Sequence, residues 1–182
     1  MKVYIIRHGQ TDWNLESRAQ GRIDIPLNDT GIKQAKALHS KIGNINFTAV
    51  YSSPLKRAAK TAEIATEGKY EIIYDERLKE RSFGDYEGKE IGTWIDSIGC
   101  DIGDIKLNAS VGNIEPVQDV LARAKNFLDD IRTKHDNNDT ILIVTHGQLA
   151  CGLHHNLVGY DENTDWLSAG YYNAEVRVYD VD

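Results

Sequence analysis

The sequence predicts an α/β protein with three layers, in which helices cover both faces of a mostly parallel sheet. Two features support this prediction. Short runs of β-branched and other apolar residues, at 3–6 and 141–144, lack polar interruptions, as is typical of strands buried on both faces. These runs alternate with segments whose apolar residues recur every three or four positions, as on one face of a helix. Such alternation favours parallel strands joined by helical crossovers.

The first predicted strand covers residues 3–6. Residues 15–29 are polar and are interrupted by glycine and proline, so we expect a loop there. A helix is expected over 31–42, because its apolar residues keep close to a helical period and Gly43 follows as a C-terminal stop.

A second strand and helix follow. Residues 48–51 form a short strand-like run. A helix is expected over 55–66, because Ser53 is a good N-cap and Pro54 suits the first helical position. This helix would place Arg57 in its first turn or just past it.

The middle of the chain is less regular. A strand is expected at 71–74, and two glycines with mixed polarity predict a shaped loop over 77–88. Residues 89–98 are expected to form a short helix. Residues 99–115 are rich in Gly and Asp and show no clear period, so we expect an irregular excursion and not a domain boundary.

The last third returns to regular alternation. The clearest helix opens at Pro116 and keeps its apolar residues on one face as far as Ile131. A strand over 140–145 and a helix over 148–157 come next. Residues 174–180 alternate in polarity like a final strand at an edge of the sheet.

Length and composition fit a single domain over residues 1–182, with 41% hydrophobic and 27% charged residues. The formal net charge of −7 argues against a nucleic-acid or anionic-membrane surface, and no apolar run is long enough to cross a membrane. Two cysteines without a CxxC motif, and an N-terminus without an apolar signal core, favour a reduced cytoplasmic protein. The oligomeric state is left open.

Parallel strands place their carboxyl ends at one edge of a sheet, where ligands bind in open α/β folds. The expected strands would bring Arg7, His8, Arg57 and His146 to that edge. Two arginines can donate bidentately to phosphoryl oxygens, and the amino end of the helix after Pro54 would add N–H groups. His8 is then a candidate nucleophile for phosphoryl transfer that needs no metal ion.

A departing alkoxide also needs a proton, which a carboxylic acid in the 77–88 loop could supply. Glu80 and Glu87 are both candidates, and Glu80 is our first choice. His8 must attack as neutral imidazole, with its other ring nitrogen donating to a fixed acceptor. We expect His146 to act as a cation or an N–H donor, and Glu80 to be protonated.

Four motifs together resemble those of the histidine phosphatase superfamily, also called phosphoglycerate mutase-like. They occur in the family's order and span most of the chain. In chain order they are RHGQT at 7–11 with WN at 13–14, SSPLKRA at 52–58, LKERSFGDYEG at 78–88 and VTHG at 144–147.

The resemblance implies a mostly parallel sheet with one antiparallel edge strand and a reaction that needs no cofactor. It implies that His8 is phosphorylated during turnover, while Arg7, Arg57 and His146 hold the phosphoryl group. Glu80 would be the general acid and then the general base. The further substrate-binding residues that it implies are Asn14, Gln20, Gly21, Arg81, Gly147 and Gln148.

The family includes hydrolases and mutases. The segment between Glu80 and His146 is short and has no adjacent arginine pair, although Arg81 matches a mutase position. These features favour the small phosphatase branch, which includes α-ribazole phosphatase and broad-specificity phosphatases, with a small phosphorylated metabolite as substrate. The alternatives are a phosphoglycerate mutase and a non-catalytic protein that binds a phosphorylated ligand.

Other conspicuous side chains are expected to be structural. Trp94 and Trp166 could close over the substrate or pack in the core. The pair His154-His155 lacks the ligand set of a metal site. We expect His39 and His135 to be exposed on helices. A solvated acidic face is expected from Asp96, Asp101, Asp104 and Glu115.

Overall fold

The computed structural model describes residues 1–99, 103 and 111–181. These residues contain a five-stranded sheet in the order β3-β2-β4-β1-β5. The strands are β1 (Lys2–Arg7), β2 (Ala49–Ser52), β3 (Ile72–Tyr74), β4 (Thr140–Thr145) and β5 (Val176–Asp180). The α-helices are α1 (Asp12–Leu15), α2 (Asp29–Ile42), α3 (Lys56–Ala65), α4 (Val117–Lys134) and α5 (Gly147–Val158).

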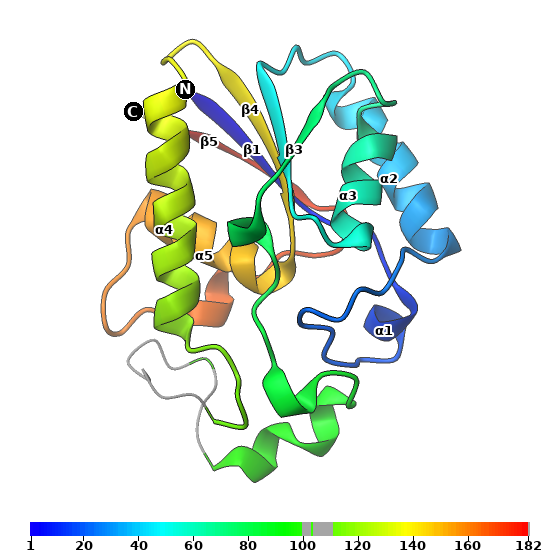
Figure 1. The fold of residues 1–182 in the computed structure, drawn as a ribbon, viewed down its shortest axis with the longest axis vertical. Coiled ribbons are helices and arrows are strands. Elements are labelled where there is room, and N and C mark those ends of the chain that lie inside the picture. The colour runs from blue at the N-terminus through cyan, green and yellow to red at the C-terminus, as the bar shows by residue number, and fades with distance from the viewer. Residues whose placement is uncertain (100–102, 104–110, 182) are drawn as a thin grey trace.

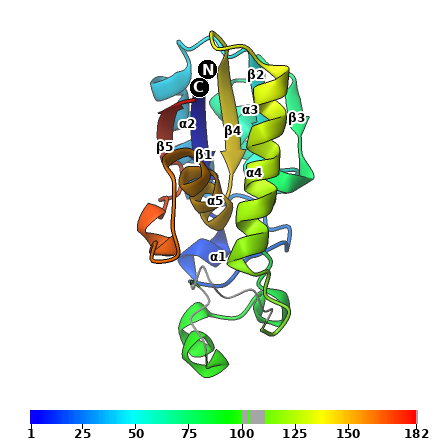
Figure 2. The same cartoon turned by 90° about the vertical axis from the view of Figure 1, so that its left-hand side faces the viewer.

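The sheet is parallel except at one edge. β4 pairs in parallel with both β1 and β2, and β2 pairs in parallel with β3. β5 pairs antiparallel with β1. Helices α4 and α5 cover one face, while α2 and α3 cover the other (Figures 1 and 2). The predicted three-layer fold with an antiparallel edge strand is confirmed.

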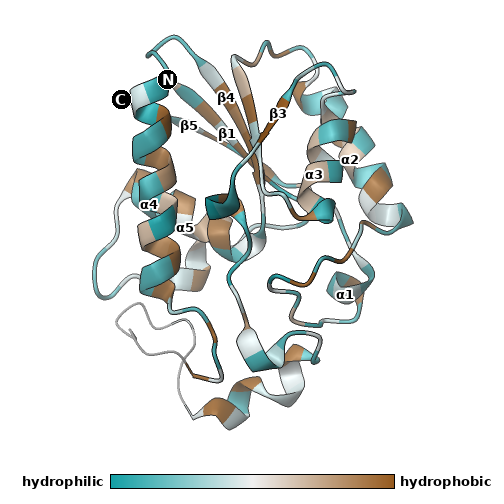
Figure 3. Cartoon of the chain, viewed as in Figure 1, coloured by the Kyte–Doolittle hydropathy of each residue, from teal (hydrophilic) through white to brown (hydrophobic). Residues whose placement is uncertain are grey.

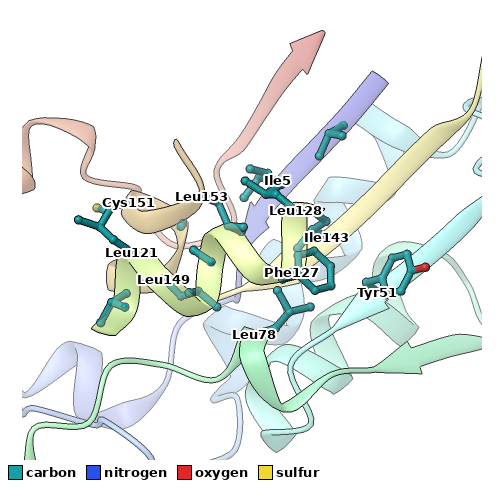
Figure 4. Close-up of a cluster of buried hydrophobic side chains, with 14 of the residues drawn as sticks. Ile5, Tyr51, Leu78, Leu121, Phe127, Leu128, Ile143, Leu149, Cys151 and Leu153 are labelled. Atoms are coloured by element: carbon teal, nitrogen blue, oxygen red, sulfur yellow. The ribbon is translucent and has the colours of Figure 1, made fainter. Parts of the chain in front are cut away.

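Two cores account for this layering, because successive side chains of a strand point to opposite faces. Val3 and Ile5 of β1 join the core under α4 and α5, whereas Ile6 joins the core under α2 and α3. Figure 4 shows the first of these cores, where Phe127 and Leu128 of α4 lie against the sheet. Figure 3 shows α4 with apolar and hydrophilic residues alternating along its length, as expected of an amphipathic helix.

The topology gathers the ends of several strands at one edge. Because β1, β2 and β4 are parallel, Arg7, Ser52 and Thr145 all end their strands there. The segment around residues 79–99 lies beyond this edge, opposite the sheet (Figure 1, green). The site described below is built between them.

The start of α3 differs from the prediction. The helix begins at Lys56 with Leu55 as its N-cap, and not at a Ser53 cap followed by Pro54. The Ser53 hydroxyl accepts from the Leu55 amide at 3.3 Å and also lies 2.8 Å from Nε2 of His146. The Lys56 amide donates to Asp24 Oδ1 at 2.7 Å. The serine is therefore used for a contact between distant motifs.

The prediction of a helix over 89–98 is also wrong. Two short 3-10 turns cover Ile91–Thr93 and Ile95–Ile98 instead, and Gly99 ends the second in the left-handed region. Trp94 is buried between these turns, with its ring stacked on Tyr86 at a centroid distance of 4.4 Å. Two turns around a buried aromatic ring thus take the place of one regular helix.

Several side chains expected on the surface are partly or fully enclosed. His39 and His135 are half-buried, and His135 lies 2.9 Å from the Tyr51 hydroxyl through Nε2. Trp166, for which closing over the substrate and packing in the core were the alternatives, is fully buried and packs in the core. Glu115 pairs with a buried arginine and does not belong to a solvated face, although Asp96 is exposed.

Asp101 and Asp104 lie outside the described residues, as does most of the irregular excursion predicted over 99–115. None of the described helices combines the length and hydropathy that a membrane span requires.

Candidate active site

A cavity of about 200 Å³ opens at the carboxyl edge of the sheet. The predicted site residues that line it are Arg7, His8, Asn14, Gln20, Gly21, Arg57, Glu80, Gly147 and Gln148. Two predicted residues, Arg81 and His146, are close by but do not line it. Residues from four distant motifs thus meet around one small volume.

His8 follows the last residue of β1 and is 2% exposed. Its Nδ1 lies 2.6 Å from the Gly9 carbonyl oxygen, which can only accept a hydrogen bond, so we assign the proton to Nδ1. Nε2 then carries the lone pair that a nucleophile needs. Burial, followed by the charges of Arg57 and Arg7, lowers the pKa of His8 well below its ordinary value and favours the neutral imidazole.

The turn after His8 requires glycine because two chain segments approach closely. A Cβ on Gly9 would lie 2.5 Å from the backbone oxygen of Gly31 at the start of α2. The Gly9 amide donates to the Thr61 hydroxyl at 3.1 Å. These contacts fix the backbone that carries the imidazole.

His146 is fully buried behind the wall of the cavity, with its ring centroid 5.1 Å from that of His8. Nε of Arg57 donates to Nδ1 of His146 at 3.2 Å, so Nδ1 carries a lone pair. Nε2 therefore holds the proton and donates to Ser53 Oγ at 2.8 Å. Burial, Arg57 and His8 lower the pKa of His146 well below its ordinary value.

Of the two states expected for His146, a cation or an N–H donor, the contacts favour the second. The imidazole is neutral, and its N–H donates to a serine. A second positive charge next to Arg57 would be costly in a buried site. His146 instead orients the guanidinium of Arg57.

Arg57 is fully buried and donates from all three guanidinium nitrogens. Besides its bond to His146, Nη1 donates to the Ile23 carbonyl at 2.8 Å and Nη2 to the Gly21 carbonyl at 2.7 Å. Burial lowers the pKa of Arg57 to about 10, against the opposing charges of Glu80 and other carboxylates. Arg57 thus remains a cation at neutral pH.

Arg7 supplies the second cation. Its Nη1 donates to the Tyr171 carbonyl at 2.5 Å, and burial lowers its pKa. Its buried Nε has no hydrogen-bond partner among the residues that the structure describes. Arg7 lines the cavity, so its guanidinium group can donate to an anionic ligand there.

Glu80 also lines the cavity, and hydrogen bonds to one of its carboxyl oxygens hold it in place. Oε1 accepts from the backbone amides of Arg81 at 2.9 Å, Gln148 at 3.1 Å and Leu149 at 3.3 Å. Oε2 has no hydrogen-bond partner in the described part of the chain, so it is the oxygen that can exchange a proton with a ligand. The amide of Gln148, expected to reach the substrate, is taken by Glu80.

Asn14 and Gln20 both present amide donors. Oδ1 of Asn14 accepts from the Thr11 amide and from Nδ2 of Asn173, while Oε1 of Gln20 accepts from the Thr11 hydroxyl. Their side-chain oxygens are thus occupied, and their NH₂ groups are left for the cavity. Two neutral donors therefore complement the two guanidinium groups.

Arg81 does not line the cavity; its Nε donates to the Glu115 carbonyl at 2.6 Å, and its Nη1 lies 3.5 Å from Gln148 Oε1. At the amino end of α3, the Lys56 amide donates to Asp24. Arg81, which the sequence predicts to bind substrate, does not line the cavity.

Other residues around the site gave no signal in the sequence. Phe83, Ile91 and Leu167 line the cavity and make part of its wall apolar. Asn173, which lies far along the chain from the motifs, donates to the His8 carbonyl at 3.1 Å as well as to Asn14. Contacts of this kind depend on the fold and on no local pattern.

This cavity can bind a tetrahedral anion beside an imidazole with a free lone pair. The donors are fixed in advance by buried hydrogen bonds, an arrangement that favours stabilisation of the charge on a phosphoryl group. Among the described residues, no group of three or more His, Cys, Asp or Glu side chains is placed to hold a metal ion.

A sequence model of the histidine phosphatase superfamily (branch 1) matches residues 3–182. The chain belongs to this superfamily. The sequence is 33% identical over 177 residues to PhoE of Bacillus subtilis, an uncharacterized phosphatase, covering 95% of this chain and 87% of that protein. It is 30% identical to phosphoserine phosphatase 1 of Hydrogenobacter thermophilus, covering 100% of this chain and 87% of the relative.

The fold agrees with this membership. The structure of YhfR from Bacillus stearothermophilus superposes with a TM-score of 0.87 at 33% identity, covering 100% of this chain and 91% of that one. The protein is thus an enzyme of the histidine phosphatase superfamily, and its phosphatase relatives support a phosphatase activity.

Proposed function

We propose that this protein is a phosphomonoesterase that hydrolyses a small phosphorylated metabolite through a phosphohistidine on His8, without a metal ion. The observation that carries the proposal is the pairing of a lone pair on His8 Nε2 with the guanidinium group of Arg7 in one cavity. The first is a nucleophile, and the second is a donor for the group that it attacks.

In the first step Nε2 of His8 attacks phosphorus and forms an N–P bond, while the bond from phosphorus to the ester oxygen breaks. Protonated Glu80 gives its proton to the departing oxygen from Oε2, so the alcohol leaves neutral. Arg7 and Arg57 stabilise the charge on the phosphoryl oxygens, and Asn14 and Gln20 add neutral donors.

In the second step ionised Glu80 takes a proton from water as the water oxygen attacks phosphorus. The N–P bond breaks, the electron pair returns to Nε2, and inorganic phosphate leaves. The Gly9 carbonyl keeps the proton on Nδ1 through both steps, so the lone pair is restored on the attacking nitrogen.

Hydrolysis is favoured over mutase activity by the position of Arg81. This arginine matches a mutase position, yet its Nε donates to a backbone carbonyl and its side chain does not line the cavity. The cationic side chains that do line it are Arg7, Arg57 and Arg18. Nε of Arg18 donates to Glu16 at 2.5 Å, and its Nη1 donates to the Gly88 carbonyl at 2.8 Å.

The test is release of inorganic phosphate from a panel that includes phosphoserine, phosphoglycerates, sugar phosphates, nucleotides and α-ribazole phosphate, with a chelator present. We expect His8→Ala to abolish release, and rapid quenching of the parent to trap an acid-labile phosphoryl group on His8. His39→Asn, a change on α2 away from the cavity, should be as active as the parent. Release that survives His8→Ala would refute the proposal.

A further inference from the structure

Glu80 lies in a segment without regular secondary structure. Residues 79–82 lie between two 3-10 turns and form neither helix nor strand. The three amides that hold Oε1 fix one end of the side chain, but the place of its backbone must come from other contacts. A general acid needs an accurate position, since a shift of about 1 Å can cost about a hundredfold in rate.

Arg123, on α4, holds the backbone on the amino side of Glu80. Its Nη1 donates to the Arg77 carbonyl at 2.7 Å and to the Lys79 carbonyl at 2.6 Å. The Arg123 side chain is only 15% exposed, so these carbonyls have a buried cation as their partner. Lys79 is the residue directly before Glu80.

Glu115, just before α4, holds the backbone on the carboxyl side of Glu80. Its Oε2 accepts from the Ser82 amide at 3.0 Å, and its own amide donates to the Ser82 carbonyl at 2.9 Å. Its carbonyl accepts from Nε of Arg81 at 2.6 Å. The Glu115 side chain is 11% exposed.

The two anchors form one unit. Arg123 donates to Glu115 through Nε at 2.7 Å and through Nη2 at 3.0 Å, a bidentate pair. Burial opposes ionisation of Glu115, but the hydrogen bond and charge of Arg123, with further help from Arg22, hold its pKa below the ordinary value. The carboxylate is therefore charged whenever the enzyme is folded at neutral pH.

We propose that Arg123 and Glu115 are positioning residues, which clamp the backbone on both sides of Glu80 and so aim its carboxyl group at the leaving oxygen. The inference rests on the role of Glu80 in the proposed function. The planar guanidinium is required because it serves the carboxylate from two nitrogens and the two carbonyls from the third. A lysine ammonium cannot span the same acceptors.

A purely structural role for the pair would lower stability or affect all substrates alike. A positioning role predicts losses of activity that differ between substrates, because only substrates with a poor leaving group need the acid. p-Nitrophenolate leaves without a proton, whereas a simple alkoxide does not. The ratio of kcat/KM for an alkyl phosphate to that for p-nitrophenyl phosphate therefore reports how well the acid is placed.

The experiment measures this ratio for the parent, Glu80→Gln, Arg123→Lys and Glu115→Gln. We expect Arg123→Lys and Glu115→Gln each to lower the ratio about tenfold or more, in the same direction as Glu80→Gln. Lys125→Ala is the matched control, because Lys125 lies on the same helix but is exposed and pairs with Asp129. It should leave the ratio unchanged.

Equal losses on both substrates, or an unchanged ratio in the folded variants, would overturn the positioning role while leaving the proposed function intact. If Glu80→Gln itself does not change the ratio, the assignment of the acid fails instead. Thermal unfolding shows which variants are folded, and Glu115→Gln, which keeps the shape of the side chain, decides the matter if Arg123→Lys does not fold.

Discussion

Acidification should destabilise this protein in a pH range where most proteins of ordinary composition are stable. His8 and His146 are 2% and 0% exposed, and each is neutral in the folded state because burial and nearby cations lower its pKa well below the ordinary value. In the unfolded chain both would titrate near a pKa of about 6.5. Below that pH the unfolded state binds protons that the folded state does not.

The sign and size of this pH effect on the free energy of unfolding follow from proton linkage. A group with a lowered folded pKa contributes stability that is present above its unfolded pKa and is lost as the pH falls toward its folded pKa. Between pH 7.5 and 5.5 each histidine should lower the free energy of unfolding by at most about 1.4 kcal/mol, so both together account for up to about 2.7 kcal/mol. His154, whose pKa is also lowered by burial and His155, acts in the same direction.

The assay is urea unfolding at a series of pH values in a buffer free of phosphate, with the free energy of unfolding taken at each pH. His8→Gln removes one of the two linked protons, so its loss between pH 7.5 and 5.5 should be smaller by up to about 1.4 kcal/mol, whatever its absolute stability. A parent whose stability is flat over this range, or a variant with the same slope as the parent, would refute the argument that both imidazoles are neutral in the fold.

Three substitutions test other parts of the structure. Arg57→Lys keeps the charge but loses the fork that reaches His146 and the Gly21 carbonyl, so kcat/KM for phosphate release should fall by about a hundredfold or more. Gly21→Ala should lower the free energy of unfolding by at least about 1 kcal/mol in a urea titration, because Gly21 has a φ of +49° and a Cβ there would clash with the Glu87 side chain. Phe127→Ala should cost about 3–5 kcal/mol by the same measurement, since this ring is fully buried in the core under α4.

The features that the sequence predicted well are those that one element determines by itself. Ile141 to Val144 have no polar interruption because β4 has helices over both faces, and this burial is visible in the sequence as a continuous apolar run. Once three such strands are parallel, the meeting of Arg7, His8 and Arg57 at one edge follows from geometry. The collection of most site residues around one cavity could therefore be predicted.

Local rules failed where a distant group competed for the same side chain. Serine is a residue type that often caps helices, but the Ser53 hydroxyl lies against His146, which is 93 positions further along the chain. The same contact selects between the two states expected for His146, because an imidazole that accepts from Arg57 and donates to Ser53 has no place for a second proton. Both outcomes depend on one hydrogen bond, which joins two motifs that lie far apart in the sequence.

Glu115 shows why charged residues are the hardest to interpret from a sequence. It ends a segment rich in Asp and Gly, which is typical of a solvated loop, and a lone carboxylate is most often exposed. It is buried because Arg123, two turns along the next helix, returns to meet it, and because the backbone of the Glu80 segment supplies the remaining hydrogen bonds. A buried ion pair gains little from its charges alone, since desolvation offsets much of their attraction. This pair fixes the position of the segment that carries the acid, because each guanidinium nitrogen of Arg123 and both carboxyl oxygens of Glu115 have hydrogen-bond partners there. Its value would then lie in the rate of proton transfer more than in the stability of the fold, and for this reason the leaving-group ratio is a better measure of its role than a melting temperature.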